Sequence, residues 1–152
     1  MKVGVVIDAS CDLPRTYIEE RGLAVLPGFR DFGVKVLVDA RDPRETLAYY
    51  RRYIADKSIP AGSRAWPVEN IRDLFLNELI LRYDRVLVLC VSASRGGVFA
   101  NATEASYGIL QGYREARETA GLDESFALRV LDTNSVGPGE GVIAHETLSL
   151  IE

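Results

Sequence analysis

Three segments of the chain place small polar residues directly after a run of apolar, mostly β-branched residues. The apolar runs cover residues 2–7, 85–91 and 127–131, and the polar segments cover residues 8–14, 92–97 and 132–137. Serine hydroxyls, asparagine amides and backbone N–H groups in such turns can donate hydrogen bonds to a small polar or anionic group. The sequence therefore predicts a binding site for such a group, provided that the fold brings the three segments together.

The strongest candidate is the second polar segment, which contains Ser92, Ser94, Arg95, Gly96 and Gly97. It follows an apolar run and opens a helical pattern, and both the unpaired N–H groups and the dipole of a helix start favour an anion. The two glycines would let a ligand approach the backbone closely. The alternative is a plain connection from strand to helix, in which Ser94 only caps the helix.

Two further segments could contribute to the same site. Ser10 lies in the first polar segment, and the loop before Pro67 carries Ser63, Arg64 and Trp66. This loop either folds over the site from the side or is an ordinary surface connection. In the same way, Trp66 is either a wall of the pocket or part of the core.

Residues that could perform catalysis or hold a metal are few. His145 is the only histidine, so neither a metal site nor a histidine relay is expected. Cys11 has no nameable partner base that would make it a nucleophile, and Cys90 is expected to pack as a small hydrophobic residue. Asp8 and Asp132 each end an apolar run, where turn and capping roles are commoner than acid–base catalysis. With no phosphate-loop motif either, we expect a non-enzymatic protein without a metal or cofactor.

The composition is that of an ordinary globular chain. Its 152 residues suit one domain, with 47% hydrophobic and 26% charged residues. The net charge of −4 argues against the clustered basic charge of a nucleic-acid-binding surface. No stretch reaches the roughly 18 apolar residues of a membrane span, and the N-terminal apolar run is too short for a signal peptide. With two cysteines expected to stay reduced, these features favour a cytoplasmic protein.

Apolar and turn patterns predict alternating strands and helices. Strands are expected at residues 2–8, 23–27, 85–91 and 127–131, with an irregular strand or hairpin at 28–39. Helices are expected at residues 14–21 and 43–56, from residue 67, at about 98–119, and from about residue 138. Asp12 and Asp42 are expected to cap the first two helices, and Gly22 and Gly121 to end helices. The alternation predicts an α/β fold: a parallel sheet with helices on both faces, doubly wound.

In such a sheet the carboxyl ends of the strands meet at one edge, and ligands bind there. The three polar segments are therefore expected to form one cup. The final predicted helix is still apolar at Leu148, Leu150 and Ile151, and no capping signal follows it. Either the chain is a fragment, or this apolar face packs on a partner such as a second copy of the chain.

Four segments of the chain resemble the signature segments of the DegV family, in the same order and at fitting separations. They are residues 8–14, 60–67, 92–99 and 132–141. The resemblance implies a bacterial fatty-acid carrier that does no chemistry itself, whose first domain is a parallel α/β unit. It also implies a second, larger domain that encloses the acyl tail and is absent from residues 1–152. Some members of the family hand the bound acid to a kinase, so a kinase partner is implied as well.

The resemblance also implies which residues hold the ligand's carboxylate: hydroxyl side chains at the strand ends, which here leaves Ser10, Ser63, Ser92 and Ser94. Other family hydroxyl positions are occupied by residues without one, namely Ala9, Ala61, Gly62, Ala93 and Gly96. Arg64 and Arg95 appear in those same loops, and an arginine can hold a carboxylate through two parallel bonds. We hypothesise that the anion site is rebuilt around a guanidinium; alternatively both arginines point to solvent and the ligand has been lost.

Two other function classes stay open. An interaction or dimerisation module with a vestigial pocket would explain the apolar final helix. A phosphotransfer domain is less favoured, because it would need a histidine near a strand end, whereas His145 lies inside the last predicted helix.

Overall fold

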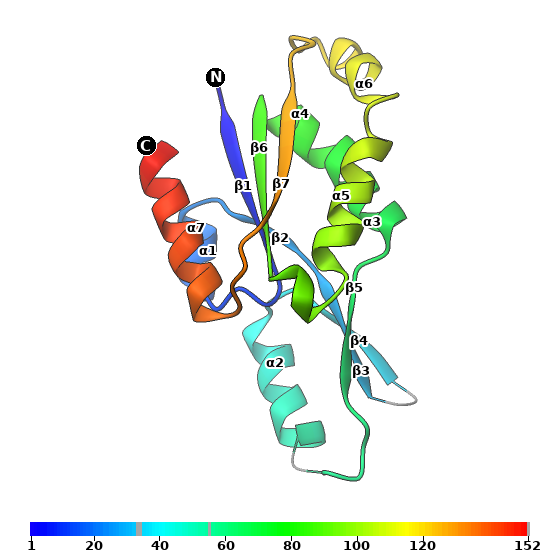
Figure 1. Ribbon diagram of the computed structural model, residues 1–152, viewed down its shortest axis with the longest axis vertical. Helices are drawn as coiled ribbons and strands as arrows, with labels where there is room; N and C mark the ends of the chain where they lie inside the picture. The colour runs from blue at the N-terminus through cyan, green and yellow to red at the C-terminus, as the bar shows by residue number, and fades with distance from the viewer. Residues whose placement is uncertain (33–34, 55, 152) are drawn as a thin grey trace.

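A parallel sheet forms the centre of the computed structural model, which describes residues 1–32, 35–54 and 56–151 (Figure 1). Four strands form this sheet in the order β2-β1-β6-β7, and all neighbours are parallel. Their bounds are Val3–Asp8 (β1), Ala24–Leu26 (β2), Arg85–Cys90 (β6) and Ala127–Asp132 (β7). The predicted α/β fold with a parallel, doubly wound sheet is confirmed.

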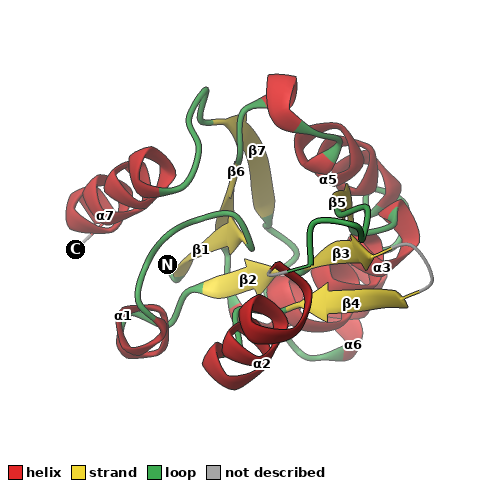
Figure 2. Ribbon diagram, turned by 90° about the horizontal axis from the view of Figure 1, so that it is seen from below, coloured by secondary structure: helices red, strands yellow, loops and turns green. Residues whose placement is uncertain are grey.

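Helices cover both faces of this sheet, as Figures 1 and 2 show. One face carries α1 (Arg15–Glu20) and α7 (Pro138–Ile151). The other face carries α3 (Val68–Leu74), a π-helical stretch (Phe75–Leu79), α4 (Ile80–Arg82), α5 (Val98–Gly108) and α6 (Tyr113–Thr119). Crossovers between parallel strands place helices in this way because each helix must return the chain to the start of the next strand.

The core has two layers because both faces of the sheet are buried. Val6 and Val88 point into the larger layer, beneath α3 and α5. Ile7 and Leu89, one residue further along each strand, point into the smaller layer under α1 and α7. Alternation of side chains along a strand produces this division, and burial on both faces explains why the strands read as continuous apolar runs.

A second, antiparallel sheet lies beyond the carboxyl ends of the parallel strands (Figures 1 and 2). Its order is β4-β3-β5, with bounds Gly28–Phe32 (β3), Lys35–Asp39 (β4) and Gly62–Ala65 (β5). The predicted hairpin at 28–39 is confirmed, although its turn at 33–34 lies outside the described residues. The sequence predicts a loop before Pro67, and this is wrong for residues 62–65, which form β5. Nothing in this short polar segment indicates that it pairs with β3. This sheet packs on α2 (Pro43–Tyr49) through Phe32.

Several predicted helix boundaries need correction. The helix expected over 98–119 is two helices, α5 and α6, which residues 109–112 separate. The helix expected over 43–56 is α-helical only to Tyr49 and continues as a π-helical stretch (Tyr50–Ile54). Asp12 does not cap α1: Pro14 holds the N-cap position, without a side-chain hydrogen bond. Asp42 does cap α2, since its side chain accepts hydrogen bonds from two backbone N–H groups.

The last helix is only partly covered. Ala144 is buried in the smaller core layer, with Ile143 and Leu148 packed against that layer. By contrast, Val142 is 62% exposed and Leu150 is 87% exposed. Among the helices that the structure describes, none is both long and apolar enough to cross a membrane.

Candidate ligand site at the carboxyl edge of the parallel sheet

The ends of β1 and β6 are joined by the carboxylate of Asp8. Its Oδ2 accepts a hydrogen bond from the backbone N–H of Val91 at 2.6 Å, and its Oδ1 accepts one from the backbone N–H of Ser10 at 2.7 Å. Asp8 is buried, so both bonds are shielded from water. Asp8 thus stabilises its own turn, as predicted, and also binds the end of β6. Its bond to Val91 fixes the first polar segment relative to the second.

The second and third polar segments also meet at this edge. Ser92 donates its backbone N–H to the carbonyl of Ser135 at 2.8 Å. The carboxylate of Asp132 accepts hydrogen bonds from the N–H groups of Ala93, at 3.3 Å, and Asn134, at 2.8 Å. The three segments that the sequence singles out therefore lie together, as expected for parallel strands.

Residues 92–97 present most of their polar groups to the surface. They form a short 3₁₀ turn (Ala93–Arg95), in which the hydroxyls of Ser92 and Ser94 lie 2.9 Å apart. Ser94, Arg95, Gly96 and Gly97 are all exposed. The N-cap position of α5 belongs to Gly97, so Ser94 does not cap that helix.

The segment 62–67 lies beside this edge, where β5 passes close to it. A Cβ added at Gly97 would lie 3.8 Å from the Cβ of Ala65, and one added at Gly28 would lie 3.9 Å from the Cβ of Ala9. Ser63 is exposed on β5. Trp66 packs partly buried against the larger core layer, and its carbonyl accepts a hydrogen bond from the Asn101 amide at 2.8 Å.

The two arginines of the guanidinium hypothesis differ in their surroundings. The Arg64 guanidinium is paired with Asp31 at 3.2 Å (Nε to Oδ2) and lies over the ring of Phe29. An incoming anion would have to compete with the Asp31 carboxylate for it. Arg95 is exposed, and within residues 1–32, 35–54 and 56–151 its side chain has no hydrogen bond or ion pair. Of the two, Arg95 is the arginine available to a ligand.

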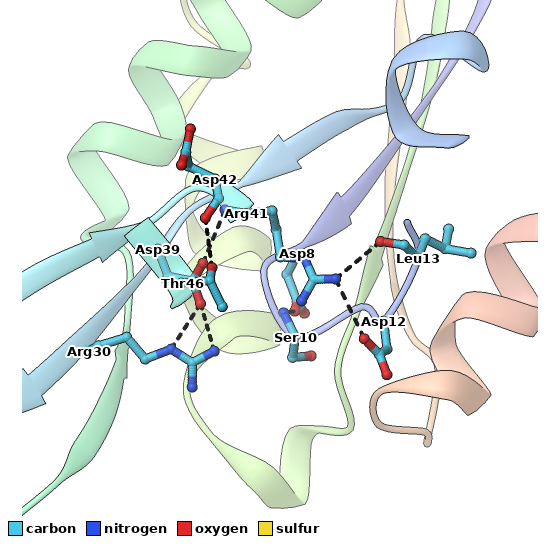
Figure 3. Close-up of polar contacts among 9 residues, drawn as sticks. All are labelled: Asp8, Ser10, Asp12, Leu13, Arg30, Asp39, Arg41, Asp42 and Thr46. Carbon is cyan, nitrogen blue, oxygen red and sulfur yellow. Dashed lines mark hydrogen bonds and ion pairs between the residues drawn. The ribbon is translucent and has the colours of Figure 1, made fainter. Parts of the chain in front are cut away.

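A third arginine, Arg41, reaches the site from the second sheet (Figure 3). Its Nη2 donates to the carbonyl of Leu13 at 3.1 Å and lies 3.5 Å from the Asp12 carboxylate. Its backbone has a φ of +63°, in the left-handed region that side chains with a Cβ seldom adopt. Sequence reasoning missed Arg41, because no local pattern indicates that the end of the β3–β4 hairpin lies against the first polar segment.

A buried carboxyl group, Glu140, lies directly behind Ser10. The Ser10 hydroxyl and the Glu140 Oε2 are 2.9 Å apart, and Glu140 has no exposed surface. Burial and the negative charge of Asp8 raise the pKa of Glu140 to about 8, against the smaller lowering effects of hydrogen bonds from Ser10 and from the backbone of Asp8, and of the charge of Arg41. In sequence, Glu140 lies in the first turn of a helix, where acidic residues are common and usually exposed. Nothing in the sequence therefore indicates that Glu140 is buried at the site.

The cysteines and the histidine are unsuited to catalysis at this edge. Burial, Glu140 and Asp8 raise the pKa of Cys11 to about 12, and burial also raises the pKa of Cys90. Both thiols therefore stay protonated at neutral pH. His145 lies on α7 away from the edge, with its Nδ1 2.7 Å from the Tyr17 hydroxyl. The described residues contain no group of three or more His, Cys, Asp or Glu that could hold a metal ion.

A cavity of about 380 Å³ lies at the second sheet. It lies between the β3–β4 hairpin and α2, and its lining includes Arg30, Arg41, Tyr49 and Tyr53. Arg30 is held there by Asp39, whose Oδ2 is 2.6 Å from its Nη2 (Figure 3). Arg41 therefore contributes both to this cavity and to the surroundings of the first polar segment.

Comparisons with known proteins agree with this architecture. The chain is 40% identical over 150 residues to a DegV domain-containing protein of Xanthomonas campestris, covering 99% of this chain and 48% of that protein. It is 29% identical over 107 residues to a fatty acid-binding protein of Thermotoga maritima, covering 70% of this chain and 37% of that protein. Its fold is similar to the crystal structure of a DegV lipid binding protein from Thermotoga maritima, with a TM-score of 0.81 and 22% identity, covering 99% of this chain and 48% of that one.

Most of these matches cover almost all of this chain, and all of them cover only part of the related protein. The chain spans about half the length, or less, of the curated relatives it matches. Within the chain itself, residues 2–152 match the family of uncharacterised proteins described as DegV. This protein chain therefore belongs to the DegV family.

Proposed function

We propose that this chain binds a fatty acid or a similar small anionic lipid, without catalysing a reaction, and holds the ligand's carboxylate at the carboxyl edge of the parallel sheet. The observation that supports this most strongly is the meeting of the three polar segments at one edge, with Ser94, Arg95, Gly96 and Gly97 exposed. The named functions of the two relatives from Thermotoga maritima, fatty acid binding and lipid binding, point the same way.

The exposed groups suit a carboxylate because they are donors. The Ser92 and Ser94 hydroxyls share one hydrogen bond between them, so one hydroxyl proton remains for a ligand. The Arg95 guanidinium can add two parallel bonds and a positive charge. Ser10, in the loop after β1, and Ser63, on β5, complete the set of side chains that we assign to the headgroup.

A direct test uses the purified protein after removal of bound lipid. Titration with palmitate, followed by isothermal calorimetry, should show saturable binding. Mass spectrometry of lipid extracted from the protein as purified should show acyl chains. Absence of palmitate binding, together with the absence of acyl chains from several preparations, would overturn the proposed function.

Replacing Arg95 by alanine should weaken palmitate binding by roughly three- to tenfold, because an exposed charged contact contributes on the order of 1 kcal/mol. The effect should shrink as salt is added, since exposed charges are screened. Arg114→Ala is the matched control. Arg114 is an exposed arginine on α6, so its replacement removes the same charge at the far end of the sheet. Equal palmitate affinities for the wild type and Arg95→Ala would rule out the guanidinium hypothesis.

A self-association module is the second candidate, and the exposed apolar residues of α7 favour it. Val142 and Leu150 lie on that helix, and Leu131 is exposed on β7, the last strand of the parallel sheet. Sedimentation of the protein at several concentrations tests this candidate. A kinase that receives the bound acid is a further proposed partner, which the family resemblance suggests.

A further inference from the structure

We propose that Glu140 acts as a neutral acid that donates a hydrogen bond to the Ser10 hydroxyl oxygen, so that Ser10 turns its own proton outward to the carboxylate of the ligand. Glu140 is thus a positioning residue that acts through Ser10. This inference rests on the proposed function, because it requires an anionic headgroup at the carboxyl edge of the sheet.

The geometry around Glu140 carries the argument. Its side chain is 0% exposed, its Oε2 lies 2.9 Å from the Ser10 hydroxyl, and the backbone of Asp8 is the other hydrogen-bonding group that faces the carboxyl group. Its other oxygen, Oε1, is buried without a partner among the residues that the structure describes. An ionised carboxylate in this position would leave a charged acceptor desolvated and unpaired, which is costly. A neutral carboxyl group has a proton to place on Ser10 and avoids that cost.

The charged and titratable groups that face Glu140 come from four parts of the fold. Asp8 lies at the end of β1, Cys11 in the loop after it, Cys90 at the end of β6, and Arg41 after β4. Both thiols are protonated near neutral pH, so the charges that matter are the negative Asp8 and the positive Arg41. Arg41 is already engaged by Asp12 and by the Leu13 carbonyl. The pKa of Glu140, raised to about 8, agrees with a neutral acid at pH 7.

The direction of the Ser10 hydroxyl proton follows from the state of Glu140. A serine hydroxyl has one proton to donate. When Glu140 is ionised, that proton must point to Oε2, and Ser10 turns an oxygen lone pair toward the ligand. When Glu140 is neutral, the carboxyl group can supply the proton of the shared bond, and the Ser10 proton becomes free for the ligand. Ser10 is half-buried and contacts Glu140, so both arrangements are geometrically available.

Ligand binding and protonation of Glu140 must therefore favour each other. An anionic headgroup should bind more tightly when Glu140 is neutral, and by linkage it should raise the pKa of Glu140 by the same free energy. A rise of about one unit corresponds to about a tenfold change in affinity. Affinity should therefore fall as pH rises through 8 and beyond.

The test uses octanoate, a short fatty acid that stays ionised and monomeric across the pH range. For the wild type we expect the octanoate affinity to fall about tenfold between pH 6.5 and 9.5. Glu140→Gln should keep the affinity that the wild type has at pH 6.5 and lose most of this pH dependence, because the glutamine amide is a permanent donor. Ser10→Ala should bind octanoate more weakly than the wild type at pH 6.5. Glu146→Gln, an exposed change on the same helix, should follow the wild type throughout.

A second measurement does not depend on any variant. The side-chain ¹³C resonance of Glu140 in the wild type should titrate near pH 8, and near pH 9 when octanoate is bound. Two results would overturn the positioning role of Glu140 while leaving the proposed function intact: octanoate affinity that does not change with pH, or a pKa of Glu140 that octanoate does not shift. No octanoate binding at any pH would overturn both.

Discussion

Arg117→Met should lower the free energy of unfolding by about 3–5 kcal/mol, the loss expected when a buried charged network is broken. The Arg117 guanidinium is buried and donates hydrogen bonds to the carbonyls of Ile80, Tyr83 and Asp123. It also contacts the Asp84 carboxylate at 3.1 Å. Methionine fills a similar volume but has no donor, so these buried carbonyls lose their partner. Urea unfolding followed by circular dichroism measures the loss, which should correspond to a fall in Tm of about 10 °C.

The same helix supplies the control for this prediction. Arg114 is exposed on α6, and Arg114→Met should leave the unfolding transition close to that of the wild type. Because Arg117 ties α6 to the connection between α4 and β6, at the opposite end of the sheet from the candidate site, the folded Arg117→Met protein should still bind palmitate as the wild type does (Figure 1). Equal stability of Arg117→Met and Arg114→Met would contradict the structural role.

The parallel sheet was predictable because its central strands, β1 and β6, are largely buried on both faces. Strands such as β1 and β6 therefore read as uninterrupted apolar runs, and each ends where small polar residues begin. Two parallel neighbours necessarily end at the same edge, so the meeting of the polar segments followed from the fold class alone. The sequence therefore predicts only those site residues that directly follow a parallel strand, such as Ser92 and Ser94.

One strand of the second sheet, β5, could not be predicted in the same way. β5 is four residues long and mostly exposed, with the sequence Gly-Ser-Arg-Ala, so neither alternation nor β-branched residues mark it as a strand. Its pairing with β3 depends on contacts across more than 30 residues of sequence. Arg41 follows β4 of the predicted hairpin, but no local pattern gives the position of this hairpin relative to the parallel sheet, so the sequence does not mark Arg41 as a ligand arginine.

Glu140 was missed for a different reason. In sequence it follows Pro138 in the first turn of a helix, where an acid is favoured by the helix dipole and is usually exposed. Only the fold shows that this turn packs against the loop after β1, where Gly141 approaches Leu13 so closely that an added Cβ would lie 3.3 Å from it. Burial of a single polar side chain depends on such packing, which no local pattern encodes.

Asp8 links the stability of the sheet to the shape of the site, so its replacement should affect both. Asp8→Asn should lower the free energy of unfolding by about 2–4 kcal/mol, because a buried carboxylate that accepts two N–H groups is replaced by an amide. The amide oxygen can still accept from Ser10 or from Val91, but its NH₂ group then faces the other donor. Thermal unfolding of Asp8→Asn measures this loss. Asp123→Asn, the same change at an exposed position whose side chain accepts one N–H bond, from Ser125, should unfold close to the wild type, because the amide oxygen can keep that bond.

The same replacement should weaken palmitate binding by more than tenfold, even at temperatures where the protein is folded. The Val91 N–H that Asp8 accepts lies directly before Ser92, so loss of this bond frees the segment 92–97 to move relative to β1. In the other orientation of the amide, Val91 keeps its acceptor and Ser10 loses its anchor instead, and with it the fixed distance to Glu140. Binding donors that are no longer held in place must be ordered by the ligand, at the expense of affinity. If Asp8→Asn bound palmitate as tightly as the wild type, the headgroup would have to lie elsewhere than at this edge of the sheet.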